Sequence, residues 1–126
     1  MMEIKEIRDK VLEIGNVTSC AVMIVKKDGD ITEYVVTDPD KTLVSLADLV
    51  EIASLISLRY DIVGYNKMLG GLKMTTDEFR DHLTISAMIE ENLLVLVVPI
   101  TVDLNKITQE LKTILSMKVK NIGSTK

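Results

Sequence analysis

Two rows of apolar side chains run along residues 42–69, although a helix packed against a core needs only one. At about 100° per residue, the first row shares one face of a helix and comprises Leu49, Ala53, Ile56 and Tyr60, extended by Leu46 and Val50. The second row lies on a different side and comprises Leu55, Leu58, Ile62, Tyr65 and Leu69. The pattern therefore predicts a long helix, with Thr42 as its N-cap, that must be covered on two sides.

Shorter apolar patterns predict the other elements. Spacings of three and four residues indicate helices over 2–14 and 103–117. Runs that alternate, or that are apolar throughout, indicate five strands at 20–25, 31–37, 72–79, 82–89 and 93–98. The dipeptide Asp28-Gly29 tolerates the positive φ of a tight turn, so the first two strands should form a hairpin.

The arrangement of these elements follows from the two strands that are apolar at every position, 20–25 and 93–98. Such strands are buried on both faces, so helices should cover both sides of the sheet. We therefore expect an α/β (α+β) fold: a five-stranded, mainly antiparallel sheet with the long helix on one face and the N- and C-terminal helices on the other. Residues 1–118 should form a single domain, and 119–126 should form a frayed C-terminal tail.

The second apolar row on the long helix is the strongest functional signal in the sequence. A neighbouring element of the same chain could cover it, but the two shorter helices have one apolar stripe each, which the other face of the sheet would use. Left exposed, the row would form a patch of several hundred Å², on the order of the largest that monomers tolerate. A second copy across a twofold axis would cover it economically.

The predicted homodimer interface therefore combines this row with the short, polar strand that follows it, which suits the edge of a sheet. It comprises Leu55, Leu58, Ile62, Tyr65, Leu69, Lys73 and Thr75. Three charged residues flank the row and are candidates for contacting a further partner: Asp48, Glu51 and Arg59. An arginine finger at Arg59 is the less favoured interpretation, because solvated charges on helices are commoner.

Composition narrows the classes of function. The chain has 126 residues, of which 47% are apolar and 27% charged, as in globular domains. The net charge of −4, the lack of a basic stripe and the absence of Trp argue against nucleic-acid binding. The longest apolar run, 93–100, is far shorter than the roughly 18 residues that would span a membrane. We therefore expect a cytoplasmic protein with no membrane insertion.

Candidate chemistry is sparse. His82 is the only histidine, and Cys20 heads an apolar strand without a neighbouring base, so a histidine at the surface or at a sheet edge and a core thiol are expected. Gly70-Gly71 lacks the Lys-Ser/Thr of a phosphate-binding loop and is better explained as the end of a helix. The sequence thus predicts no catalytic residue, no metal site and no cofactor, and the protein is not expected to be an enzyme.

Three segments carry a resemblance to a known family: the hairpin CAVMIVKKDGDITEYVV, the helix end LGGLKMTT, and HLTISAMIEENLLVLVV followed by a helix. Together, from residue 2 to about 117, they resemble the roadblock family of dynein light chains and small-GTPase regulators, which has a profilin-like fold. The resemblance implies a homodimer with its long helices side by side and its third strands paired. It also implies a non-catalytic platform that docks a Ras-like small GTPase or belongs to a motor or signalling complex.

An alternative function is a sensory module of the PAS-like or profilin-like kind, which would hold a small ligand between sheet and helix. Such a module needs an interior pocket with polar anchors. On the sheet-facing side the sequence offers Tyr60 and Ser86 and little else, so this alternative ranks second.

Overall fold

The computed structural model describes residues 3–15, 17–39, 41, 43–63 and 73–116. In chain order the elements are α1 (Ile4–Leu12), β1 (Cys20–Val25), β2 (Ile31–Thr37), α2 (Leu46–Val63), β3 (Met74–Glu78), β4 (His82–Ile89), β5 (Asn92–Pro99) and α3 (Leu104–Ser116). The strands form one sheet in the order β2-β1-β5-β4-β3, and every neighbouring pair is antiparallel.

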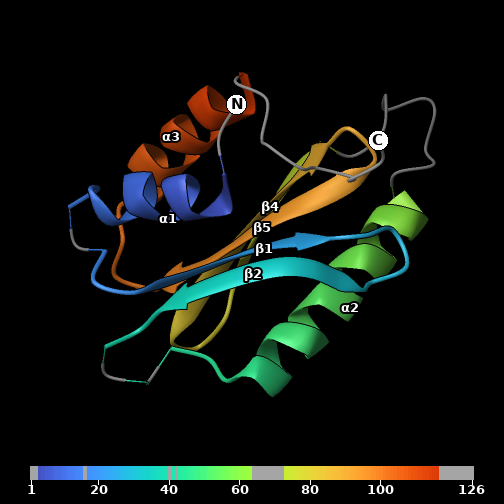
Figure 1. Ribbon diagram of the computed structural model, residues 1–126, viewed down its shortest axis with the longest axis horizontal. Helices are drawn as coiled ribbons and strands as arrows, with labels where there is room; N and C mark the ends of the chain where they lie inside the picture. Colours follow the sequence, from blue (N-terminus) through green and yellow to red (C-terminus); the bar gives the residue numbers. More distant parts are fainter. Residues whose placement is uncertain (1–2, 16, 40, 42, 64–72, 117–126) are drawn as a thin grey trace.

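The helices lie on the two faces of this sheet as the sequence predicts: α2 covers one face, while α1 and α3 share the other (Figure 1). Alternate residues of the central strands supply two separate cores. Val22 belongs to the core under α1 and α3, whereas its neighbour Met23 belongs to the core under α2. This alternation explains why β1 and β5 are apolar throughout, and the predicted fold class is confirmed.

The start of α2 differs from the prediction. The helix begins at Leu46 and not near Thr42, which itself lies outside the described residues. A carboxylate oxygen of Asp38 accepts a hydrogen bond from the Leu43 backbone at 2.7 Å, which stabilises the preceding loop. Ser45 then caps the helix: its hydroxyl accepts from the Asp48 backbone at 3.1 Å, and its own N–H donates to the Asp48 carboxylate at 3.0 Å. Asp48 thus takes the place of the Glu or Gln of a usual capping box.

The two outer strands, β2 and β3, differ in character. β3 is short and polar, and its residues alternate between the faces of the sheet opposite β4. Thr75 lies opposite Ser86 and Asp77 lies opposite Thr84, on the face that carries α2. The longer β2 carries exposed Tyr34 and Val36 on that same face, because they pair with Met23 and Ala21 of the α2-side core.

None of the helices within the described residues is long and apolar enough to cross a membrane.

Candidate functional site

The candidate site is the outer side of α2 and the groove that separates this helix from β3. The residues of α2 that pack on the sheet are Leu49, Ile52, Ala53, Ile56 and Tyr60. Leu55 and Leu58, from the predicted second row, are 58% and 55% exposed. The described part of the chain therefore leaves both leucines in solvent. The side chains of Ile62, Tyr65 and Leu69 lie outside the described residues.

One part of the sequence-based assignment is wrong. Leu46 and Val50 were expected to extend the buried face, yet both are about half exposed, and Ile52 is buried in their place. The contact stripe of α2 is rotated toward Ile52 and packs against residues of β1 and β5. The exposed apolar surface of α2 is consequently larger than that of the second row alone.

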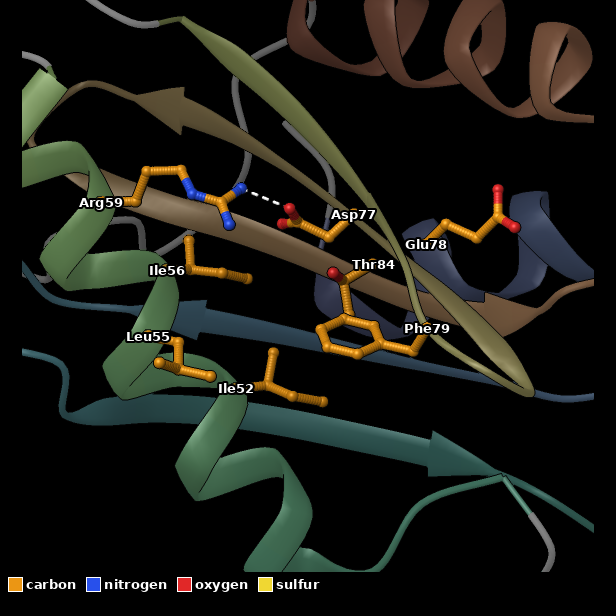
Figure 2. Close-up of a pocket in the computed structure, with 8 residues that line it drawn as sticks. All are labelled: Ile52, Leu55, Ile56, Arg59, Asp77, Glu78, Phe79 and Thr84. Atoms are coloured by element: carbon orange, nitrogen blue, oxygen red, sulfur yellow. Dashed lines mark hydrogen bonds and ion pairs between the residues drawn. The ribbon is translucent and has the colours of Figure 1, made fainter.

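A groove of about 220 Å³ runs between α2 and the end of β3 (Figure 2). One side is apolar and is formed by Ile52, Leu55 and Ile56 of the helix, while Phe79 closes the groove from the sheet side. Arg59 of α2 forms an ion pair with Asp77 of β3 at one end. This pair links the helix to the edge strand across the groove.

The three charged candidates for partner contact have different surroundings. Hydrogen bonds from the backbone and the hydroxyl of Ser45 hold the pKa of Asp48 below its usual value, so this carboxylate serves the helix cap. Arg59 is engaged by Asp77. Glu51 is exposed on the outer side of the helix.

A buried polar cluster lies beneath the helix, toward β3. The Tyr60 hydroxyl donates to the carbonyl of Ser86 at 3.1 Å and lies 3.3 Å from its Oγ. The Thr75 hydroxyl lies 2.6 Å from the same Oγ. Burial raises the pKa of Tyr60. Thr75, predicted to lie in the dimer interface, therefore directs its hydroxyl into its own fold, whereas Lys73, from the same prediction, is exposed.

Among the described residues, neither Cys20, in the core under α1 and α3, nor His82 is part of a catalytic arrangement. Burial raises the pKa of the Cys20 thiol to about 12, which makes it a core residue without nucleophilic character at neutral pH. Burial also lowers the pKa of His82, whose ring stacks on Phe79 with centroids 4.8 Å apart. Within the described ranges, no three His, Cys, Asp or Glu side chains gather as metal ligands would.

Sequence reasoning missed the sheet side of the groove, which consists of Asp77, Phe79 and Thr84. The signal available for Asp77 was its alternation with Thr75, which places both on the α2 face of β3. Thr84 Oγ1 is buried and has no hydrogen-bond partner among the described residues. The aromatic Phe79 follows the strand directly and had no comparable signal.

Comparisons with known proteins give a consistent fold. No protein-family model and no curated protein matches the sequence. Among solved structures, the gliding protein MglB of Thermus thermophilus is similar over 97% of this chain and 90% of its own, with a TM-score of 0.74 and 15% identity. A Roadblock/LC7 domain of Streptomyces avermitilis is similar over 90% of this chain and 92% of its own, with a TM-score of 0.66 and 13% identity.

A third structure, MglC of Myxococcus xanthus, is similar over 90% of this chain and 93% of its own, with a TM-score of 0.61 and 16% identity. All three similarities span most of both chains, although their sequence identities are low. The chain therefore has the roadblock fold.

Proposed function

We propose that this protein is a non-catalytic, homodimeric regulator or scaffold that binds a Ras-like small GTPase or a motor or signalling complex in the cytoplasm. In this proposal residues 1–118 form one roadblock-like domain, and 119–126 form a tail. The observation that supports it best is the pair of exposed leucines, Leu55 and Leu58, on a helix that stands beside an open sheet edge.

The proposed dimer places the two copies of α2 side by side and pairs the two copies of β3. The buried part of the interface consists of Leu55, Leu58, Ile62, Tyr65 and Leu69. Exposed leucines in the 3,4 pattern are typical of helix-on-helix contacts. Lys73 and Thr75 would lie along the paired strands, where the hydroxyl of Thr75 is already engaged with Ser86. The groove beside Leu55 would be filled by side chains of the partner's helix.

Leu58→Asp tests the dimer, because a carboxylate in an apolar seam would be desolvated without a cation beside it. Multi-angle light scattering should give at least two protomers for the wild type, and the variant should have a smaller mass because it loses the contact through α2. Gln109→Asp, which adds the same charge on exposed α3, is the matched control and should leave the mass unchanged. A wild-type protein that remains monomeric at high concentration would disprove the homodimer.

The small-GTPase partner is proposed from the resemblance to roadblock regulators, and the similarity in fold to MglB supports the roadblock fold that this role would use. We propose Asp48, Glu51 and Arg59 as candidates for the partner-facing surface, with Glu51 favoured because the other two side chains are engaged within the fold. The test is titration of the dimer with purified Ras-like GTPases of the same cell, loaded with GDP or with a non-hydrolysable GTP analogue. Equal affinity for both forms would argue for an anchor and against a nucleotide-sensing regulator.

One observation favours the alternative, a small-ligand sensory module. Thr84 lines the groove and its buried hydroxyl oxygen has no partner among the described residues, as would be expected at a ligand contact. The groove volume of about 220 Å³ is below the roughly 300–1,000 Å³ of typical small-molecule pockets, so this function remains second.

A further inference from the structure

The outer edge of β2 is a second surface open to pairing, on the opposite side of the sheet from β3. Within the described part of the chain, every hydrogen bond formed by β2 runs inward to β1. Its one charged residue is Glu33, whereas Tyr34 and Val36 are 50% and 38% exposed. An edge strand with one charge and two exposed apolar side chains lacks the protection that usually prevents strand pairing.

The neighbouring flank of α2 is also apolar. Leu46 and Val50 are 53% and 51% exposed. At about 100° per residue they lie far around the helix from Arg59, which reaches β3, so they are on the flank turned toward β2. The contact between Ser57 and the Lys27 carbonyl in the β1–β2 turn fixes that orientation, because Ser57 lies on the same flank. Figure 1 shows β2 as the outermost strand on this side of α2.

We propose that this surface is an interface with a second copy of the chain, in which the β2 strands of two protomers pair antiparallel about a twofold axis through Val35. The pairing of β2 with β1 is regular from Glu33 to Thr37 and irregular where Ile31 pairs with Val25. Val35 is the centre of the regular part. The twofold axis therefore uses the straight stretch of the strand and leaves the bulged end free.

This register is self-complementary. Tyr34 lies opposite Val36 of the partner subunit, and by symmetry Val36 lies opposite the partner's Tyr34, which gives two aromatic and β-branched cross-strand pairs on the α2 face. Val35 lies opposite its own counterpart. Glu33 lies opposite the hydroxyl of Thr37 of the partner subunit.

The registers shifted toward Glu33 fit less well. A shift of the axis to Glu33 sets two carboxylates against each other, and a shift to Tyr34 sets each carboxylate against a valine. The exposed flank of α2, with Leu46 and Val50, then borders the paired strands and extends the apolar contact. The strand's own sequence thus identifies a second copy of itself as the fitting occupant.

This interface is separate from the surface around Leu58 that the proposed function uses. A protomer with both interfaces has two different twofold contacts, so assembly proceeds beyond the dimer. Light scattering over a range of concentrations should then give four or more protomers for the wild type. Val36→Lys and Leu58→Asp should each give two protomers, and the double variant should give one.

The outcomes separate the two interfaces. A wild-type dimer that only Leu58→Asp dissociates would overturn the β2 interface and leave the proposed function standing. A wild-type dimer that only Val36→Lys dissociates would do the reverse. Equal masses for Val36→Lys and the wild type would overturn the β2 interface in any background. Gln109→Lys, which adds the same charge on exposed α3, is the control and should leave the mass unchanged.

A second measurement needs no variant and covers the case in which Val36→Lys fails to fold. Hydrogen exchange of the wild type should slow with rising protein concentration at the outward amides of 33–37, because pairing with a second copy protects them. Exchange in this segment that is independent of concentration, while the mass rises, would overturn the proposal. Tyr34→Glu is an independent variant, and it should reduce the mass of the assembly to the same extent as Val36→Lys.

Discussion

Arg59 of α2 and Asp77 of β3 form an ion pair across 18 residues of sequence and between two different elements. The arginine side chain is 42% exposed and the aspartate side chain is 18% exposed, so the pair lies at the rim of the groove rather than in the core. It is a polar link between the helix and the strand that together form the proposed dimer surface. The pair therefore connects the position of β3 with that of α2.

The stabilisation from this pair should be small. Partly exposed ion pairs contribute about 0.5 kcal/mol, because water screens them and two side chains lose freedom. A double-mutant cycle with Arg59→Met and Asp77→Asn measures the coupling, followed by urea denaturation in a monomeric background that carries both Leu58→Asp and Val36→Lys. A coupling near zero would show that the contact positions the strand without stabilising the fold.

Removal of the Tyr60 hydroxyl should lower the free energy of unfolding by more than the loss of the Arg59–Asp77 pair. Tyr60→Phe keeps the ring in the core under α2 and deletes the hydrogen bonds to Ser86, so the free energy of unfolding should fall by about 1–2 kcal/mol. Tyr34→Phe is the matched control, since Tyr34 is half exposed. Its stability in the monomeric background should stay within about 0.5 kcal/mol of the parent. Equal losses in both variants would contradict the role assigned to the Tyr60–Ser86 contact.

The cap of α2 should make stability depend on acid pH. The hydrogen bonds from Ser45 lower the pKa of Asp48 in the folded state below its usual value. The ionised carboxylate therefore stabilises the fold above the unfolded-state pKa, and this contribution is lost as the pH falls through the lowered folded-state pKa. The free energy of unfolding, measured at a series of acid pH values, should depend less on pH for Asp48→Asn than for the parent. Asp61→Asn, an exposed residue of the same helix, should retain the parent's dependence.

The Cys20 thiol should be unreactive in the native protein. It is fully buried, and burial raises its pKa to about 12, so almost no thiolate exists at neutral pH. A thiol reagent added at neutral pH should therefore label the chain only after denaturant unfolds it. Rapid labelling of the folded protein would show that the first residue of β1 opens to solvent.

Local signals in the sequence identify most of the fold. The predicted bounds of β1, β2 and β4 agree with the structure, because apolar runs and short turns define a strand without reference to its neighbours. The start of α2 was missed since an Asp, rather than a Glu or Gln, completes the box at Ser45. A short acidic side chain at that position gives a weaker pattern.

The site is harder to predict than the fold. Helical periodicity gives the spacing of the rows on α2 but not their rotation relative to the sheet, which is why Leu46 and Val50 were assigned to the buried face. The groove exists because α2 packs on β1 and β5 and not on β3, which is a property of tertiary packing. The ion pair joins residues on two elements whose approach no local pattern encodes.

The strand order has a consequence for the assembly of the chain itself. β1 and β2 form one hairpin, β3, β4 and β5 form a meander, and in the sheet these two units join only along β1 and β5. That seam pairs residues such as Met23 and Val95, which are far apart in the sequence. Closing so long a loop is entropically costly and slows folding. On the ribosome, the first hairpin must therefore wait, with the β1 edge unpaired, until the last strand has been synthesised.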